Sequence, residues 1–404
     1  MKNIINRLMS PLRYFINDSR TVGIILIACT IISIIAANSI AGEQYRAFWN
    51  THFDSIPSLH LPGNLLEWIN NFLMGIFFLM AGTEIKRELV EGELSSFKKA
   101  VLPFGAAFGG MLVPALIFIS FNVKTSYISG WGVPTATDIA FSLGVASLLG
   151  KRVPLNLKIL LMALAIIDDL GAIVVIALFY GGKIYWFFLF IAAIIFAALL
   201  ALNYLKVKFG LLQIILSLCL WYAILQSGIE ASIAGVLFAF TIPVNKLVAV
   251  ERAIHNPVNF FILPLFAIAN TALFIPPHFT EALSTTVAAG IMVGLVIGKP
   301  VGIFLISKLL VSLNIASLPT NVKWTQVLGM GTLAGIGFTM SIFTTMLAFS
   351  SEGIQDIAKI AILSSVALSV IISVCYFWAI GITPPLANKR LIAEPKIDLT
   401  LKLA

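Results

Sequence analysis

Charged residues are scarce in this chain of 404 residues. Asp, Glu, Lys and Arg make up only 11% of it, whereas hydrophobic residues make up 59%, and the mean hydropathy is +1.01. Soluble folded proteins carry about 25% charged residues to face water, so a soluble fold is excluded. Apolar stretches of about 20 residues recur along the chain, each long enough to cross a hydrocarbon core about 30 Å thick. We therefore expect an all-α polytopic membrane protein.

Cysteine and histidine are also scarce. Cys29, Cys219 and Cys375 lie far apart, each inside an apolar run, which excludes a disulfide framework and fits no metal or redox pair. The chain has 4 histidines and no His-Glu-x-x-His sequence, which argues against a membrane metalloprotease. We expect no cofactor.

The apolar stretches divide the chain into about twelve spans within a single membrane transport domain over residues 1–404. The predicted spans cover residues 22–40, 68–85, 100–121, 132–149, 157–180, 185–204, 209–226, 229–242, 258–275, 287–311, 325–349 and 357–381. Residues 1–20 have apolar and basic positions at helical spacing, which predicts an amphipathic segment on the membrane surface. A cleaved signal peptide is the alternative, although about 20 residues before the first span is long for that role.

The basic residues indicate how the chain sits in the membrane. With the N-terminus inside, 21 Lys and Arg residues lie near cytoplasmic ends of spans and four lie on the opposite side. This asymmetry predicts a bacterial inner-membrane protein with both termini in the cytoplasm, including the tail at 382–404. The net charge of +8 is spread over short loops, so it does not indicate a nucleic-acid partner; membrane lipid is the expected surrounding.

Two predicted spans are interrupted by residues that disfavour a continuous helix. Residues 130–138 read Gly-Trp-Gly-Val-Pro-Thr-Ala-Thr-Asp, and residues 329–339 read Gly-Met-Gly-Thr-Leu-Ala-Gly-Ile-Gly-Phe-Thr. An odd number of spans separates their starts, so the two halves of the chain would be inverted in the membrane. Interrupted segments at corresponding positions of two halves are typical of a transporter's binding site. Glycine also serves close helix packing, and that alternative stays open for these segments taken alone.

Charged residues inside the predicted spans are the strongest functional signal. Asp138, Asp168, Asp169 and Lys299 fall there, and each ionised group at a helix centre costs about 2.5 to 3.5 kcal/mol. Left unpaired, the four would cost about 10 kcal/mol, so they must face a wet cavity, a partner or each other. Any one buried Asp could have a structural hydrogen-bonding role, but the cluster favours a site.

The chemistry of such a site is an exchange. Asp138 lies in an interrupted span where backbone carbonyls and the hydroxyl of Thr137 add oxygen ligands for a small cation, while Asp168 and Asp169 point about 100° apart on one helix. Burial and a nearby like charge disfavour an ionised carboxylate, so protons and cations compete for the same oxygens near neutral pH. Combined with alternating access, this competition gives antiport.

Six motifs, spread in order over nearly the whole chain, resemble the NhaA family of sodium/proton antiporters. They read Ala-Thr-Asp-Ile-Ala-Phe at 136–141, Leu-Ala-Ile-Ile-Asp-Asp-Leu-Gly-Ala at 164–172, Gly-Lys-Pro at 298–300, Ala-Gly-Ile-Gly-Phe-Thr-Met-Ser-Ile-Phe at 334–343, Glu-Ile-Lys-Arg-Glu-Leu at 84–89 and Ile-Leu-Pro-Leu-Phe-Ala at 262–267. The resemblance implies twelve spans with an inverted repeat, crossed discontinuous helices in the fourth and eleventh positions, and often a homodimer. It also implies electrogenic export of sodium or lithium in exchange for protons.

The resemblance also implies roles for single residues. Asp138 and Asp169 would bind the transported sodium or lithium with Thr137 beside it, and Asp168 would pair with Lys299. Lys299 and Asp138 would balance the dipoles of the half-helices at the crossing.

The resemblance further implies a pH-responsive group at the cytoplasmic ends of the second and ninth spans. Its members would be Glu84, Arg87, Glu88, Glu251 and His255. Glu230 is a further candidate: the family pattern has a histidine near the start of the eighth span where this chain has Glu230, which puts the detail of the pH response in doubt. Two alternatives stay open: a solvated rim without a gating role, or direct competition by protons at the aspartates.

Three other functions use buried acids. An intramembrane aspartyl protease needs Gly-x-Gly-Asp and Tyr-Asp elements, and neither precedes Asp138 or Asp168. A sodium channel would place acidic rings in a pore built from symmetric subunits, and a sodium-coupled symporter would carry more polar groups in its spans. Transport of sodium against a proton gradient distinguishes these functions from antiport.

Overall fold

A computed structural model of the chain describes residues 2–52, 61–275 and 279–381, and leaves out the side chains of residues 2–19, 93, 97 and 98. This part of the chain contains helices and no strands. The helices are α1 Lys2–Ala37, α2 Gly42–Trp49, α3 Leu65–Trp68, α4 Met74–Val90, α5 Phe97–Asn122, α6 Ile139–Leu148, α7 Leu155–Phe179, α8 Trp186–Tyr204, α9 Leu211–Ser227, α10 Ile233–Thr241, α11 Val244–Pro257, α12 Leu263–Asn270, α13 Phe279–Leu283, α14 Thr286–Val293, α15 Lys299–Ser312, α16 Trp324–Ala334, α17 Phe338–Ala348 and α18 Glu352–Ala379. Short 3₁₀ segments (η3 Glu93–Ser95, η4 Ser126–Thr135, η5 Gly150–Arg152) and π segments (η2 Ile69–Leu73, η6 Val258–Ile262, η7 Gly294–Gly298) join or extend them.

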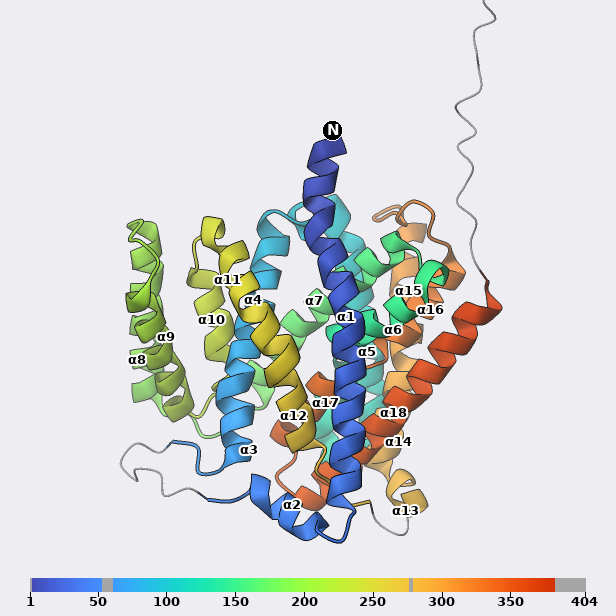
Figure 1. The fold of residues 1–404 in the computed structure, drawn as a ribbon. Helices are drawn as coiled ribbons and strands as arrows, with labels where there is room; N and C mark the ends of the chain where they lie inside the picture. Colours follow the sequence, from blue (N-terminus) through green and yellow to red (C-terminus); the bar gives the residue numbers. More distant parts are fainter. Residues whose placement is uncertain (1, 53–60, 276–278, 382–404) are drawn as a thin grey trace, which may run out of the picture.

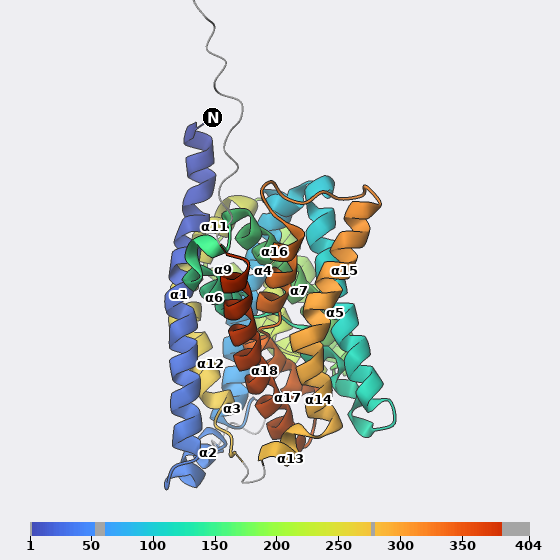
Figure 2. The same ribbon diagram turned by 90° about the vertical axis from the view of Figure 1, so that its right-hand side faces the viewer.

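The long helices run side by side in a bundle (Figures 1 and 2). Within the described residues, eight helices are long and apolar enough to cross a membrane, and α16 with α17, bent by 50°, makes a ninth candidate. This confirms a polytopic membrane protein. The remaining expected spans fall on shorter segments: η4 with α6, α9 and α10. The total of twelve spans therefore stays a prediction.

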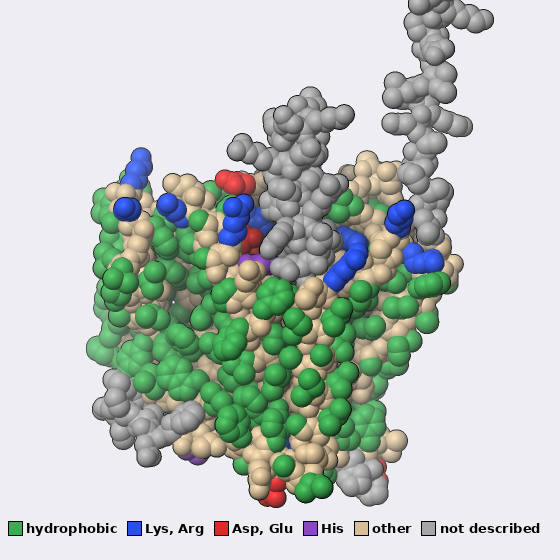
Figure 3. All heavy atoms as spheres, viewed as in Figure 1, with side chains coloured by type: hydrophobic (Ala, Val, Ile, Leu, Met, Phe, Trp, Pro, Cys, Tyr) green, Lys and Arg blue, Asp and Glu red, His purple; other side chains and the backbone are tan. Residues whose placement is uncertain are grey.

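Lys and Arg side chains gather at the end of the bundle where α1 begins, and a broad apolar band covers the face below them (Figure 3). We call this end the basic end. The separation of charge from the apolar band is the arrangement that a membrane imposes. Of the predicted surface segment at 1–20, residues 2–20 belong to one continuous helix, α1. Its side chains up to residue 19, like the tail at 382–404, lie outside the description.

The two interrupted spans fold as predicted by their glycines and proline. The segment before Asp138 forms η4, a 3₁₀ stretch containing Pro134, and the regular helix α6 begins only after Asp138. The other span breaks between Ala334 and Phe338, where three residues separate α16 from α17. Each break frees backbone groups in a region without water, so each needs partners from elsewhere in the fold.

Two of the three π segments lie just before a proline. η6 precedes Leu263-Pro264 and η7 precedes Lys299-Pro300. Proline has no backbone N–H, so the regular i to i−4 ladder lacks a donor there and the preceding turn can widen. The two prolines therefore favour the widened turn that carries Asn259 and the widened turn that lies directly before Lys299.

Close packing of α5 against α15 positions Lys299. The two helices meet at Gly109 and Gly302, where an added Cβ on either glycine would meet the carbonyl oxygen of the other. Gly110, the next residue on α5, lies against the Lys299 stem, 3.7 Å from Cε to the place of an added Cβ. Small residues at this contact therefore fix how deeply the lysine is buried.

We expect Gly302→Ala to lower the thermal unfolding temperature of the purified protein, because a methyl group would push the two helices apart. Overpacking of this kind costs about 1 to 3 kcal/mol. Gly353→Ala is the matched control, since an added Cβ there meets nothing within 4 Å. Equal melting of the two variants in detergent would show that the α5–α15 contact is not tight.

Candidate functional site

The two breaks lie against each other and satisfy each other's freed backbone groups. The backbone N–H of Asp138 donates to the carbonyl of Ile336 at 2.8 Å. The hydroxyl of Ser142 donates to the carbonyl of Leu333 at 2.9 Å, and that of Ser341 donates to the carbonyl of Val133 at 2.8 Å. The junction between the breaks is thus held by reciprocal hydrogen bonds from both halves of the chain.

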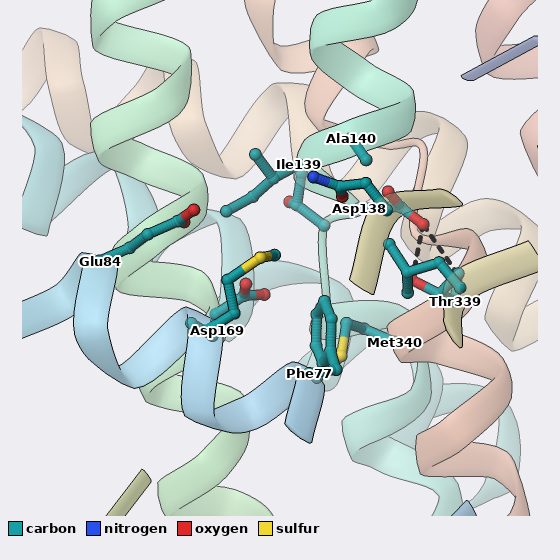
Figure 4. Close-up of a pocket in the computed structure, with 13 residues that line it drawn as sticks. Phe77, Glu84, Asp138, Ile139, Ala140, Asp169, Thr339 and Met340 are labelled. Atoms are coloured by element: carbon teal, nitrogen blue, oxygen red, sulfur yellow. Dashed lines mark hydrogen bonds between the residues drawn. The ribbon is translucent and has the colours of Figure 1, made fainter. Parts of the chain in front are cut away.

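Asp138 lies where two helices begin. Its Oδ1 accepts from the N–H of Phe141 at 2.9 Å and so caps α6. Its Oδ2 accepts from the hydroxyl of Thr339 at 2.6 Å and from the N–H of the same residue at 3.1 Å, in the first turn of α17 (Figure 4). Helix N-termini carry partial positive charge, so both helices stabilise the ionised form of this carboxylate.

Lys299 and Asp168 form an ion pair in which neither side chain is exposed. Lys299 Nζ lies 2.9 Å from Asp168 Oδ2 and also donates to the carbonyl of Thr135, the last residue of η4. A helix C-terminus carries partial negative charge, which favours a cation. Thr137 Oγ lies 2.6 Å from the same Asp168 oxygen and 3.0 Å from the carbonyl of Ala334.

Asp169, the next residue on α7, points into a separate small cavity. The cavity has a volume of about 30 Å³, which is room for about one or two water-sized species. Glu84 of α4 and Asp138 also line it, so three carboxylates from different segments face one space (Figure 4). Asp169 Oδ1 and Glu84 Oε1 have no hydrogen-bond partner within the described residues. Unpartnered buried oxygens beside a cavity are what a site for a hard cation or a proton requires.

The sequence predicted that Thr137 lies beside the cation. The structure places Thr137 at the boundary between the cavity and the Lys299–Asp168 ion pair. Thr137 lines the cavity, but its hydroxyl lies next to Asp168. The hydroxyl next to Asp138 comes from Thr339, which belongs to one of the six motifs but was given no role of its own by the sequence. Its position two residues after the last glycine of the second break could have identified it.

The predicted pH-responsive residues divide into three places. Arg87 joins α4 to α11 through Glu251, at 3.0 Å between Nε and Oε2, and lies 3.2 Å from Glu88 Oε1. Glu84 lines the cavity, three residues before Arg87. His255, one turn after Glu251, is buried and accepts from the Asn259 amide at 3.2 Å.

Glu230 does not join this group. It lies in the turn between α9 and α10, where its carboxylate accepts from the N–H of Ser232 at 3.4 Å. The backbone just before it is bonded to the loop between α7 and α8, through the N–H of Gly182 and the carbonyl of Gly228 at 2.8 Å. α7 starts at the basic end, so this loop lies at the opposite end of the bundle (Figure 1).

The described residues contain no cluster of three or more His, Cys, Asp and Glu that could hold a resident metal ion. The residues that line the cavity instead combine the carboxylates of Asp138, Asp169 and Glu84 with threonine hydroxyls and one amide. Such a set suits a weakly held cation that passes through, and each carboxylate in it can take a proton instead.

Comparisons with known proteins agree on one family. The profile of the family described as "Na+/H+ antiporter 1" matches residues 13–377. A protein of Flavobacterium psychrophilum named Na(+)/H(+) antiporter NhaA is 47% identical over 365 residues, which cover 89% of this chain and 93% of the relative. A protein of the same name from Cytophaga hutchinsonii is 44% identical over 382 residues, which cover 93% and 96%.

We expect Lys299→Ala to destabilise the protein by about 3 to 5 kcal/mol, because it leaves Asp168 as a buried charge without its partner. Adding Asp168→Asn should restore part of the loss, since the carboxylate is then gone as well. The measurement is thermal unfolding in detergent of the wild type, both single variants and the double variant. If the effects of the two substitutions simply add, the pair contributes no coupling.

Proposed function

The chain belongs to the Na+/H+ antiporter 1 family, and we propose on that premise that it exports sodium or lithium across a bacterial inner membrane in exchange for imported protons. It is a transporter and not an enzyme. Lithium, the inner membrane, and roles in pH homeostasis and salt tolerance are part of the proposal.

The observation that carries this proposal is the pair of unequal carboxylates on α7. Each has one oxygen without a hydrogen-bond partner within the described residues, but Asp168 is already neutralised by Lys299 at 2.9 Å, whereas Asp169, one residue on, lines the cavity. Asp169 is 4% exposed, so an ionised carboxylate there needs a cation, and without one it takes a proton. A single cavity that accepts either species, but not both, exchanges one for the other.

Asp138 completes the proposed cation site opposite Asp169. Both residues line the cavity, and Thr137 and Thr339 supply hydroxyl oxygens at the same junction. When sodium arrives, Asp138 and Asp169 both carry negative charge toward it, and when it leaves, protons replace it. If both carboxylates exchange in each cycle, more proton charge moves inward than sodium charge outward, so transport is electrogenic and responds to the membrane potential.

The pair of Lys299 and Asp168 is proposed to take part through the proton on Lys299. A buried lysine gives up its proton readily, and sodium at Asp169, one residue away from Asp168, would repel the ammonium group. Lys299 also faces the C-terminal end of η4 through Thr135, so a proton lost from Lys299 would leave the partial negative charge of that end without its balancing cation.

Alternating access is proposed to come from the two breaks, arranged as crossed discontinuous helices within twelve spans. Individual hydrogen bonds hold the junction, among them Ser142 to Leu333, Ser341 to Val133 and the backbone bond of Asp138 to Ile336, so it can be rearranged without unfolding a helix. In this proposal the basic end faces the cytoplasm, as do both termini, and a homodimer is the expected assembly in the lipid bilayer.

The direct test is exchange in proteoliposomes containing only the purified protein. An outward sodium gradient should drive proton uptake into the vesicles, and a proton gradient should drive sodium against its own gradient. A channel would pass sodium without moving protons, and a symporter would need an added organic solute. Either of these two results contradicts the proposal.

We expect Asp138→Asn and Asp169→Asn each to reduce exchange to the background of empty vesicles, since an amide cannot trade a proton for a cation. Asp169→Asn should not lower stability, because it removes a buried charge, whereas Asp138→Asn also loses one of the two oxygens that accept hydrogen bonds at the junction. Glu352→Gln, which removes an exposed acid at the start of α18, is the matched control and should keep full activity. Normal sodium-driven proton movement in either aspartate variant would remove these residues from the site.

We also expect acid pH to inhibit mainly by competition. As pH falls, protons occupy Asp138 and Asp169, so the KM for sodium rises, while saturating sodium restores the full rate. Rates measured over a range of sodium concentrations at each pH separate this outcome from a remote sensor. A maximal rate that still collapses at acid pH, and recovers in Glu84→Gln or Glu251→Gln, would show that the group around Arg87 controls activity instead.

A further inference from the structure

One wall of the cavity is built by the helical stretch α11–η6–α12, and it offers a single polar side chain. The residues of this stretch at the cavity are Asn259 and Leu263, one turn apart. Asn259 is 4% exposed. A buried amide beside three carboxylates is an unusual choice for a wall that could have been wholly apolar, because burying it costs free energy unless its polar atoms are used.

The amide of Asn259 has one polar atom engaged and one available. Its Nδ2 lies 3.2 Å from both ring nitrogens of His255, one turn earlier, so the nitrogen faces the histidine. Within the described part of the chain, the hydrogen bonds of this side chain are those of Nδ2 to His255, and Oδ1 takes part in none of them. Because the two branches of an amide point apart, the contact of Nδ2 with His255 leaves the carbonyl oxygen of this cavity-lining residue available to a ligand.

The backbone around Asn259 is shaped for this placement. Asn259 lies in the π segment η6, which ends directly before Leu263-Pro264. A π turn is wider than an α turn, and such turns occur often at functional sites. Proline at 264 removes the donor that would otherwise keep the turn regular, so the sequence itself maintains the widened turn.

We propose that Asn259 is a specificity-determining residue that gives the transported cation a neutral oxygen ligand through Oδ1. The inference rests on the proposed function, since it adds a ligand to the same site. Amide carbonyls are ordinary ligands of hard cations in proteins. Asp138, Asp169 and Glu84 bind protons as well as cations, whereas an amide oxygen does not bind a proton near neutral pH. Asn259 therefore strengthens cation binding without strengthening proton binding.

This division predicts a distinctive kinetic signature. In a competition between sodium and protons, losing a neutral ligand weakens sodium binding and leaves proton binding unchanged. The titratable groups that face Asn259 are Glu84, Asp138 and Asp169 around the cavity and His255 on its own helix. Asn259→Ala replaces none of them, and His255, which loses the amide contact, is not among the residues that line the cavity. The KM for sodium should therefore rise by the same factor at every pH.

The test is sodium-driven proton movement in proteoliposomes of the wild type and Asn259→Ala at several pH values. We expect the KM for sodium to rise about tenfold, the effect of losing one contact to a charged partner, with kcat nearly unchanged. Sodium should also raise the melting temperature of the purified variant less than that of the wild type, which measures binding without transport. Asn259→Ser keeps a side-chain oxygen and should recover part of the affinity, and it serves as the second variant should Asn259→Ala fold poorly.

Asn256→Ala is the matched control. Asn256 is on the same helix and of the same type, but exposed, so its KM should equal that of the wild type. A KM for Asn259→Ala within twofold of the wild type, or a fall in kcat with KM unchanged, would show a merely structural role and overturn the inference. Wild-type protein that exchanges no sodium for protons would instead overturn the proposed function, so the two failures are distinguishable.

Discussion

The structure depends on how the ends of broken helices are satisfied where no water is available. Two spans stop and restart at the same place, and each leaves backbone donors and acceptors that would cost several kcal/mol each if they were left unpaired. Asp138 meets this need at the N-terminal side by capping α6 and accepting from Thr339 of α17. Lys299 meets it at the carbonyl end of η4. The charges at the junction are therefore part of what holds the fold.

The same constraint explains why the adjacent acids on α7 differ in character. Successive residues on a helix point about 100° apart, so they face different neighbours. Asp168 faces the junction, where Lys299 and Thr137 contact one of its oxygens, while Asp169 lines the cavity. One helical step thus separates a carboxylate with a structural partner from a carboxylate that is available for a transported ion.

The sequence alone predicts those features that cost free energy at the position where they occur. Glycine and proline at the breaks and charge in apolar spans each violate a local rule, so the broken helices, the acidic doublet and Lys299 could be predicted from the order of the residues alone. The spans around α9 and α10 were harder to judge, because these helices are short, and the sequence does not say whether a short helix crosses a membrane.

Other features depend on contacts between distant segments. Thr339 and Asn259 are ordinary residues in sequence, and only the fold brings them to Asp138 and to the cavity. The π segments left no periodic signal, although Pro264 and Pro300 could have indicated where the ladder changes. Glu230 was predicted only as the residue at the place of the family's histidine, and the structure puts it at the other end of the bundle from the ion pair of Arg87 and Glu251.

The central claim is that sodium and protons share one set of carboxylate oxygens. Its most direct test is to add sodium to purified protein in weakly buffered detergent solution and to measure the protons released. The account predicts that wild-type protein releases protons as sodium binds, that more sodium is needed as the pH falls, and that Asp169→Asn neither binds sodium nor releases protons. Sodium binding to the wild type without any proton release would contradict it.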